Sequence, residues 1–415
     1  MLPLILVFLL VLISCKPSSR GPQAFTCEAC HKVSPLNLSH SQLTCKDCHS
    51  GSSPAPSKER AHQGLKRTPS HEEVEAICRG CHPGEVLAFK GTAHSTYAGE
   101  LKDIFKGFNL KIKVDDIKGL LPLEGSTHTE EGLLIDFLKR RCLSCHILSE
   151  GERYPSTYRA KGCFSCHRPH QLGKPGDEEC LSCHYGTKIG WDYYGYSPHP
   201  WFVDYRSPFI KGKQPERPYG IEAYNLKEDI HKEKGLACKD CHTKQEIMYG
   251  KEKIECLGCH KGFKEKRFHQ KKILQKVRCE VCHASFLSMD KVKRCYLEDK
   301  PDLKEWIDLS VQESAEIEEI MRAFGEGKSF EIKMRDKFTG KEKEGLWLCT
   351  LEGRRFDELI LGKDRGGRFC LLRKERLTLV YGEREISATF ENCKTPHSIG
   401  KADLNRSLKI LKELP

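Results

Sequence analysis

The sequence predicts a chain of two unlike parts. A long region of short helices and irregular structure is followed by a small α+β domain whose strands are mostly antiparallel. Three observations carry this prediction. Residues 27–283 contain nine copies of the pattern Cys-x-x-Cys-His. Only 38% of the 415 residues are apolar, below the roughly 45–50% of an average globular chain. After about residue 300 the pattern stops, and apolar residues alternate as they do in strands.

The N-terminal stretch MLPLILVFLLVLISC predicts an export signal. Its apolar run is too short to span a bilayer and has the length of a signal-peptide core. It ends in Leu-Ile-Ser-Cys, which is similar to the bacterial lipobox, so we expect residues 1–14 to be removed and Cys15 to be lipidated. A plain secretory signal or an uncleaved anchor is the alternative, because no basic residue precedes the apolar run. Residues 15–26 then form a flexible, lipidated tether.

The repeated pattern, numbered motif 1 to motif 9 in chain order, uses eighteen of the 23 cysteines. The residues of the motifs are Cys27, Cys30 and His31; Cys45, Cys48 and His49; Cys78, Cys81 and His82; Cys142, Cys145 and His146; Cys163, Cys166 and His167; Cys180, Cys183 and His184; Cys238, Cys241 and His242; Cys256, Cys259 and His260; and Cys279, Cys282 and His283.

The spacing within each motif indicates covalent attachment of haem. Residues three apart lie on one side of a short helical turn, so both thiols can reach the two vinyl groups of one haem. The histidine after the second cysteine is then placed to ligate the iron as its proximal ligand. Motif 3 shows the expected setting: Ser70 and Glu73 form a capping box, and Val74 and Ile77 share a helix face with the two cysteines.

Zinc ribbons and disulfide frameworks also use paired cysteines. Neither needs a histidine directly after every second cysteine, yet all nine copies have one. Export agrees with this interpretation, because haem is attached covalently on the outer side of the bacterial inner membrane. We therefore expect nine covalent c-type haems.

The segment GCFSCHRPHQLGKPGDEECLSCH (162–184) resembles the doubled motif of the multihaem c-type cytochromes. With the lipobox, the array is also similar to outer-membrane lipoprotein cytochromes of metal- and metalloid-reducing bacteria, including those encoded with selenite or tellurite reduction systems. The resemblance implies a haem-cored fold over residues 27–300 and a location at the periplasmic face or outer membrane. It also implies partners such as other cytochromes, a periplasmic or quinol-linked donor, and an extracellular metal or oxyanion acceptor.

Each iron has a second axial position, and the spare histidines are its candidate ligands. Ten histidines lie outside the motifs, and only His397, in the loop TPHSIG, follows the haem region; we expect it to be exposed. Nine spare histidines for nine irons predict that all haems are bis-histidine, with Met248 and Met289 as weaker alternatives. We expect His170 to reach the iron of a haem other than that of its own motif. The nine candidates are His40, His62, His71, His94, His128, His170, His199, His231 and His269.

The formal charge of +11 does not indicate nucleic-acid binding, since two propionates per haem add roughly −18 and nine ferric irons only about +9. Residues 190–224 are rich in aromatic side chains, which pack on haem faces or line a substrate pocket.

Residues 301–415 predict the haem-free domain. A helix over 310–324, strand-like runs between 329 and 390 and a last helix from 401 are separated by glycines. Another strand is expected at 108–114, FNLKIKV. Cys295, Cys349, Cys370 and Cys393 are left over, and either form disulfides or stay as buried thiols.

These features favour an electron carrier over a catalyst: a lipoprotein that relays electrons through nine bis-histidine haems. One alternative is a terminal reductase of a nitrogen, sulfur, selenium or tellurium oxyanion with one open haem. Multihaem nitrite reductases typically mark that haem with a lysine in place of the motif histidine, and here all nine motifs keep histidine. The other alternative is a subunit of a conductive cytochrome filament.

Overall fold

The computed structural model describes most of the chain from Thr26 onward. The expected signal peptide, Cys15, His199 and Met289 lie outside the described residues. The described residues are 26–32, 36, 38–198, 217–251, 253–262, 268–287, 291–306, 312–352 and 355–413.

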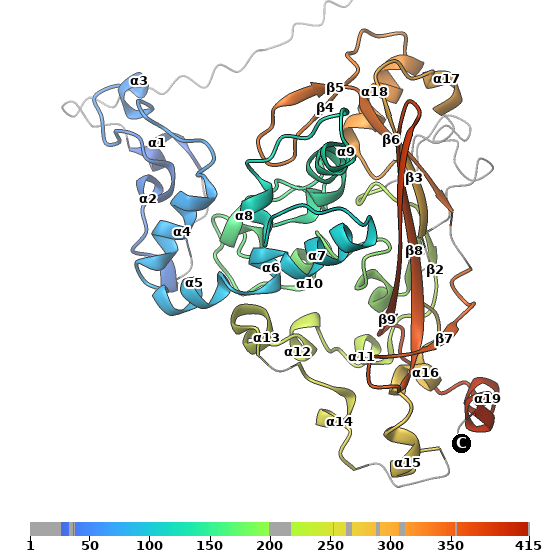
Figure 1. Cartoon of the computed structure of the whole chain (residues 1–415). Coiled ribbons are helices and arrows are strands. Elements are labelled where there is room, and N and C mark those ends of the chain that lie inside the picture. Colours follow the sequence, from blue (N-terminus) through green and yellow to red (C-terminus); the bar gives the residue numbers. More distant parts are fainter. Residues whose placement is uncertain are drawn as a thin grey trace, which may run out of the picture.

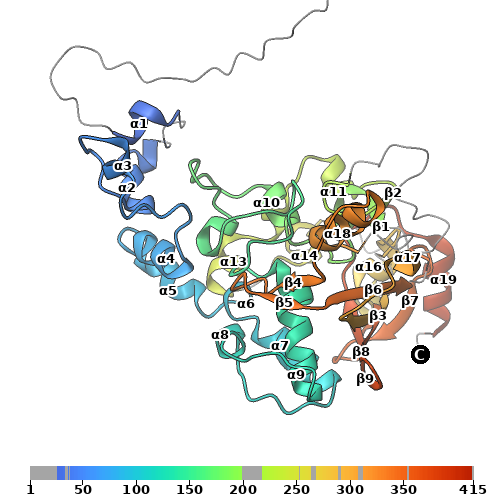
Figure 2. The same cartoon turned by 90° about the horizontal axis from the view of Figure 1, so that it is seen from above.

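Short helices that carry motifs 1 to 3 form one end of the molecule, and Figures 1 and 2 both place them far from the large sheet. Ser70 caps the longest of these helices as expected: its Oγ accepts from the amide of Glu73 at 3.3 Å, and the Glu73 carboxylate accepts from the Ser70 amide at 2.8 Å. The elements are α1 (Cys27–Cys30), η1 (Leu38–His40), α2 (Cys45–His49), α3 (Lys58–Ala61), α4 (His71–Arg79) and α5 (Pro83–Phe89).

The middle of the chain contains the largest hydrophobic core. The helix expected after Thr129 forms, and it is buried on all sides, including Leu133, Leu134 and Phe137. The strand expected at 108–114 was wrong, because this segment finds no partner strand and packs its apolar side chains against the core as an extended loop. The elements are α6 (Ala93–Thr96), α7 (Ala98–Gly107), α8 (Ile117–Leu120), α9 (Glu130–Phe137), η2 (Leu138–Cys142), η3 (Leu143–Cys145), η4 (Gly162–Ser165), α10 (Asp177–Leu181), η5 (Trp191–Tyr194), β1 (Tyr196–Pro198) and β2 (Ala223–Asn225).

Motifs 7 to 9 lie on a string of one- and two-turn helices that runs along the lower side of the molecule in Figure 1. Several of these helices start at the first cysteine of a motif, as the spacing requires. The elements are α11 (Ile230–Glu233), α12 (Cys238–Cys241), α13 (Lys244–Tyr249), α14 (Cys256–Cys259), α15 (Lys271–Leu274) and α16 (Cys279–His283).

A twisted sheet, seen edge-on in Figure 1, forms the other end of the molecule. Its strands are β3 (Lys291–Glu298), β6 (Leu346–Glu352), β7 (Ile360–Lys363), β8 (Phe369–Tyr381) and β9 (Arg384–Lys394), in the order β6-β3-β8-β7 with β9 also on β8. All pairings are antiparallel except that of β3 with β8. β4 (Lys333–Arg335) and β5 (Glu342–Glu344) form a separate hairpin, and the helices are α17 (Leu303–Trp306), α18 (Ala315–Gly325) and α19 (Leu404–Glu413).

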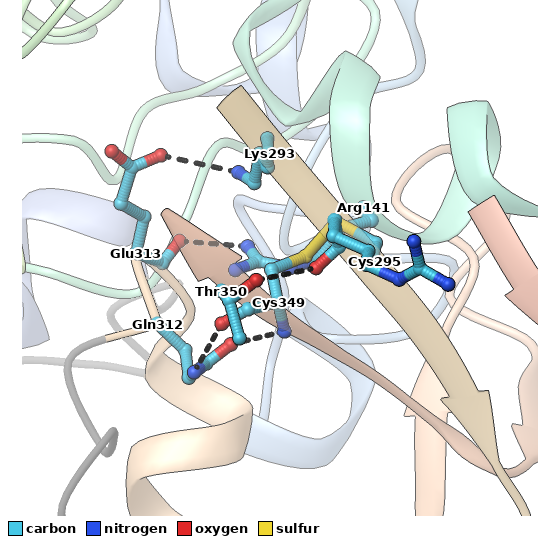
Figure 3. Close-up of a disulfide and its surroundings, with 8 residues drawn as sticks. Arg141, Lys293, Cys295, Gln312, Glu313, Cys349 and Thr350 are labelled. Carbon is cyan, nitrogen blue, oxygen red and sulfur yellow. Dashed lines mark hydrogen bonds and ion pairs between the residues drawn. A yellow bond between two sulfur atoms is a disulfide. The ribbon is translucent and has the colours of Figure 1, made fainter. Parts of the chain in front are cut away.

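The four leftover cysteines form two disulfides, Cys295–Cys349 and Cys370–Cys393. Cys295 and Cys349 stand directly opposite each other in the β3–β6 register. Gln312 braces this bond: its amide nitrogen donates to the Cys349 carbonyl at 2.9 Å, and its amide oxygen accepts from the Cys349 amide at 2.7 Å (Figure 3). Both disulfides therefore cross-link the sheet.

The sheet and the middle region share one hydrophobic core. It includes Leu133 and Phe137 of α9 together with Trp347 of β6, all almost fully buried. The Trp347 indole nitrogen donates to the Asp136 carboxylate at 2.8 Å, so a polar bond also crosses this core. β3, which precedes residue 300, is a central strand of the sheet. The C-terminal residues are thus packed directly against the part of the chain that holds motif 4.

Candidate haem-binding sites

Most motifs fold locally as their spacing requires. The amide of the motif histidine donates to the carbonyl of the first cysteine, four residues back, in motifs 1, 3, 5, 6, 7 and 8, at 2.8–3.0 Å. The motifs on α2 and α16 are helical up to the histidine. This turn places both thiols on one side with the imidazole at its end, which is the arrangement that thioether attachment needs.

In seven motifs the imidazole faces a second histidine from elsewhere in the chain. The ring centres of these pairs are 5.9–6.3 Å apart. Metal–imidazole nitrogen bonds are about 2.0 Å long, so an iron held between two imidazoles would set their ring centres roughly 6 Å apart. The pairs, motif histidine first, are His31 with His62, His49 with His170, His82 with His40, His184 with His94, His242 with His397, His260 with His231, and His283 with His269.

Hydrogen bonds orient several of these rings for a metal. The Nδ1 atoms of His49, His167 and His283 lie 2.9–3.0 Å from backbone carbonyl oxygens. Among the paired partners, Nδ1 of His231 lies 2.8 Å from the buried carboxylate of Asp229. Because a carbonyl or carboxylate requires Nδ1 to carry the proton, Nε2 keeps its lone pair for a metal. The paired residues therefore fit haem at seven of the nine motifs.

Contacts between thiols show which motifs are neighbours. Hydrogen bonding to Cys163 raises the pKa of Cys78, and the same bond lowers the pKa of Cys163 to about 7, so motifs 3 and 5 touch. The thiol of Cys238 is likewise bonded to Cys180, with its pKa raised mainly by that bond, so motifs 6 and 7 touch. These cysteines would be thioethers in a haem-loaded protein, so the attachment points of the two haems would be neighbours.

Further contacts between cysteines show the neighbours of the motifs near both ends of the chain. At the C-terminal end, the pKa of Cys279 is raised mainly by its hydrogen bond to Cys256, which joins motif 9 to motif 8. The pKa of Cys241 is raised mainly by burial and next by the electrostatic effect of the Cys259 thiol. This effect places motif 8 near motif 7. At the N-terminal end, the Cys45 thiol donates to the Glu28 carboxylate of motif 1 at 3.3 Å.

Two further contacts complete the order. Helix α2, with motif 2, packs on α4, which carries the first cysteine of motif 3. The pKa of Cys166 is raised mainly by burial and next by the electrostatic effect of the Cys183 thiol, which places motif 6 near motif 5. The motifs thus run in space as 1-2-3-5-6-7-8-9. Motif 4 is a branch at motif 6, where the Cys183 thiol donates to the Cys145 carbonyl at 3.1 Å.

The structure differs from the expected set of distal histidines at two positions. His397, expected to be exposed, is half-buried, and its ring centre is 6.0 Å from that of His242. The loop that carries it is held by Asp192, whose carboxylate accepts from the His397 amide at 2.9 Å. His128 differs in the opposite direction: it lies exposed just before α9, and its ring contacts no histidine among the described residues, so its role as a distal ligand stays a prediction.

His71 is placed beside motif 5 but is not paired. A Cβ on Gly162, which directly precedes that motif, would lie 2.4 Å from the His71 Nδ1, and this nitrogen is buried without a hydrogen-bond partner in the described structure. His167 of motif 5 has no ring contact with a histidine among the described residues. His71 thus lies beside motif 5, and its electrostatic effect on His146 places it near motif 4 as well.

The described part of the aromatic segment 190–224 is packed rather than open. Trp191 and Ile221 join a small buried cluster with Tyr185, which directly follows motif 6. Tyr219 stacks on Tyr185 at 5.3 Å between ring centres. This favours the packing interpretation over a substrate pocket at these residues.

Comparison with known protein families, curated proteins and solved structures found no match for this chain. No helix among the described residues is long and apolar enough to cross a membrane. Within the same residues, no group of three or more histidine, cysteine and carboxylate side chains is arranged as a metal site. The motifs and their paired histidines are therefore the features that indicate a function.

Proposed function

We propose that this protein is an exported multihaem c-type cytochrome that relays electrons through nine covalently bound haems, most of them bis-histidine. The observation that carries the proposal is the set of seven histidine pairs with ring centres 5.9–6.3 Å apart. Haem iron supplies one-electron chemistry when bound, at a potential set by its axial ligands and surroundings. The motif cysteines would hold each haem covalently, and in seven motifs the paired imidazoles would ligate its iron.

The partner histidines also serve the fold. His170 follows motif 5 but faces His49 of motif 2, and His94 follows motif 3 but faces His184 of motif 6. Each such pair would tie two distant parts of the chain through one iron. Such ties would help to hold the short helices of motifs 1, 2, 7 and 8, which have no buried residues of their own.

The spatial order of the motifs supports a relay with two ends. Motif 1, on α1, lies at the end of the molecule away from the sheet, whereas motif 8, on α14, and motif 9, on α16, lie on another side (Figure 1). An electron would enter at one of these ends and leave at the other. We propose another cytochrome or a quinol-linked carrier as donor and a cytochrome, metal or oxyanion as acceptor.

The two disulfides agree with the compartment outside the cytoplasm that is expected for such a relay. Two disulfides in the sheet favour an oxidising compartment outside the cytoplasm. Together with the export signal and lipobox, they support a lipoprotein attached through Cys15 at the periplasmic face or the outer membrane.

The test is the haem content of the protein produced in a host with a c-type haem maturation system. Intact-mass measurement is expected to show nine covalent haems. The double variant Cys27→Ala, Cys30→Ala is expected to carry one fewer. A mature protein with no covalent haem, or a double variant with the same mass increment as the parent, would contradict the proposal. In stopped-flow mixing with a reduced dye, all nine haems are expected to become reduced, and a subset that stays oxidised would reject a continuous relay.

A further inference from the structure

Motif 8 is the most exposed of the motifs. All nine motifs lie within the described residues, and motif 8 (256–260) is the only one whose five residues are all exposed. Its helix, α14, contains no buried residue. A haem attached to the two thiols of motif 8 would therefore lie at the surface of the protein, where another protein can approach it.

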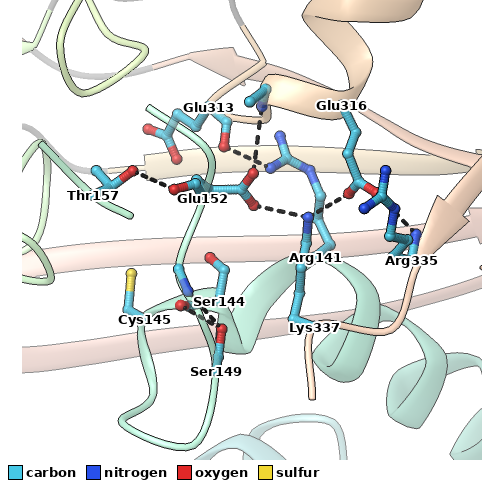
Figure 4. A network of polar contacts seen from close by, with 12 residues as sticks. Arg141, Ser144, Cys145, Ser149, Glu152, Thr157, Glu313, Glu316, Arg335 and Lys337 are labelled. Atoms are coloured by element: carbon cyan, nitrogen blue, oxygen red, sulfur yellow. Dashed lines mark hydrogen bonds and ion pairs between the residues drawn. The ribbon is translucent and has the colours of Figure 1, made fainter. Parts of the chain in front are cut away.

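Motif 4 lies at the opposite extreme. His146 is the only buried histidine among the nine motif histidines, at 5% exposure. C-terminal residues close over this motif: Lys337 forms an ion pair with the buried Glu152 at 3.2 Å, and Arg141 donates to the Glu313 carbonyl at 3.1 Å (Figure 4). The C-terminal part of the chain thus covers motif 4, whereas motif 8 stays exposed.

The protein holds motif 8 firmly from one side. His231 of α11 faces His260 at 5.9 Å between ring centres. The Asp229 carboxylate, which is 2% exposed, accepts from the His231 amide at 2.7 Å and from the Ile399 amide at 2.6 Å. These bonds tie α11 to the loop that follows the sheet. The anchored side of the motif 8 iron is therefore the side of His231, and α14 is the side that faces solvent.

Two large apolar side chains are exposed beside the cysteines of motif 8. Ile254 is 42% exposed and Leu257 is 46% exposed. Ile254 lies against the backbone of the motif, since a Cβ on Gly258 would be 3.7 Å from the Ile254 Cγ2. Single exposed apolar side chains are common, but two of them together beside a redox centre are what the centre of a protein interface requires.

The apolar pair is flanked by lysines. Lys251, Lys253 and Lys261 are all exposed, beside the exposed Glu255. Over residues 251–278 the sequence has ten lysines and arginines against three glutamates. The positive sign remains after the two propionates of one haem have added roughly −2. The charge around motif 8 is therefore complementary to an acidic surface.

We propose that residues 251 and 253–261, which we call the motif 8 surface, are the docking site for an acidic one-electron carrier protein, and that electrons pass between this partner and the relay through the haem of motif 8. The proposal rests on the proposed function, because it requires haem at Cys256 and Cys259. The exposed apolar pair favours a protein over a small oxyanion, and the lysines favour an acidic protein. Redox partners commonly meet over small interfaces, which suits a surface of this extent.

The position of motif 8 in the series agrees with this role. Its thiols lie near those of motif 7 on one side and contact those of motif 9 on the other. In each transfer one electron moves and no bond is made or broken. The centre of the carrier loses one electron as one haem iron passes from ferric to ferrous, or the reverse. An electron received at motif 8 would continue along the series.

The experiment uses the full-length nine-haem protein and, as the probe, reduced plant-type ferredoxin, an acidic one-electron carrier. Stopped-flow mixing gives the second-order rate of haem reduction. Lys251→Glu combined with Lys261→Glu is expected to lower this rate roughly tenfold at low ionic strength. The difference is expected to disappear near 1 M salt, where charges are screened within about 3 Å. The matched control is Lys46→Glu with Lys58→Glu, two exposed lysines near motif 2, which change the total charge equally and are expected to keep the parent rate.

A second variant tests the apolar part of the motif 8 surface. Leu257→Ser is expected to lower the rate with ferredoxin roughly fivefold, because an apolar contact in the complex is lost. Salt does not screen such a contact, so this loss is expected to persist at high ionic strength. Leu87→Ser, at a side chain that is 75% exposed on α5, is the matched control and is expected to leave the rate unchanged.

Several outcomes would overturn the proposal. Every variant is first checked for nine haems by mass and for complete reduction by a small reduced dye, and failure of the parent protein at this step would contradict the proposed function instead. A parent rate with ferredoxin in the variant with Lys251→Glu and Lys261→Glu would reject the motif 8 surface. An equal or larger loss in the variant with Lys46→Glu and Lys58→Glu would place docking at the other end of the series. Loss of binding to phosphatidylglycerol vesicles in the motif 8 variant, with the ferredoxin rate unchanged, would show that this surface meets a membrane.

Discussion

Replacement of His397 by alanine tests the pairing that sequence analysis missed. The His397 ring faces His242 at 6.0 Å between centres, so it is placed to be the second ligand of motif 7. The backbone amide of residue 397 donates to Asp192 at 2.9 Å, while the ring Nδ1 lies 3.9 Å from the same carboxylate, beyond hydrogen-bond distance. His397→Ala therefore removes the imidazole and leaves the bond that holds the loop.

The size of the expected effect follows from the ligand count. One of nine haems loses its sixth ligand, so roughly a ninth of the haem signal is expected to change from low-spin to high-spin. Asp192 stays satisfied, because the Gly190 amide also donates to it at 3.0 Å. The cost in unfolding free energy is therefore expected to stay within about 1 kcal/mol, as for a partly exposed side chain.

The assay is electron paramagnetic resonance on oxidised protein, with haem content fixed by mass. His128→Ala is the matched control, because His128 is exposed and its ring contacts no histidine among the described residues. His397→Met offers a rescue, since a thioether can replace the imidazole and raises the haem potential. An unchanged low-spin count in His397→Ala, or an equal loss in His128→Ala, would refute the pairing.

Three further predictions concern the packing around the sites. Trp347→Phe removes the 2.8 Å buried hydrogen bond to Asp136 and is expected to cost about 2 kcal/mol in urea unfolding; a loss below the error of the measurement would contradict the role of that bond. Burial raises the pKa of Asp336, but the amides of Thr339 and Phe338 and the ion pair with Lys139 together lower it. The resulting stabilisation is fully present above the unfolded value of about 3.9 and is lost as the pH falls through the lower pKa of the folded state; Asp336→Asn is expected to flatten acid unfolding in that range, and an unaltered pH profile would count against it. Gly162→Ala, at a φ of +65°, would place a Cβ 2.4 Å from the His71 Nδ1, so the spectrum of the motif 5 haem is expected to change, with Gly64→Ala, where nothing lies within 4 Å, as control.

Local structure could be predicted from the sequence, whereas the long-range pairing of histidines could not. The capping box of Ser70 and Glu73 and the buried helix after Thr129 depend on neighbours within one or two turns, and both form as expected. The partner of an imidazole depends on how the whole chain folds. Counting histidines inside the haem region therefore included the exposed His128 and left out His397, which reaches motif 7 through a loop after the sheet.

The surroundings of the motif 4 histidine could not be predicted for the same reason: among the described residues, its ring contacts Tyr97 and Phe338 rather than a histidine. Nine spare histidines matched nine motifs in number, which suggested that every iron is paired. Tyr97 lies three residues after His94, but nothing in the spacing of the sequence shows that its ring faces His146. Likewise, the alternation of apolar residues in the C-terminal part predicts strands without showing that their core is shared with α9.

The central claim is that the paired histidines ligate haem iron, and low-temperature electron paramagnetic resonance of the oxidised protein tests it most directly. With nine haems verified by mass, at least seven are expected to be low-spin, one for each of the seven pairs. A protein in which several of those seven haems are high-spin would contradict the account.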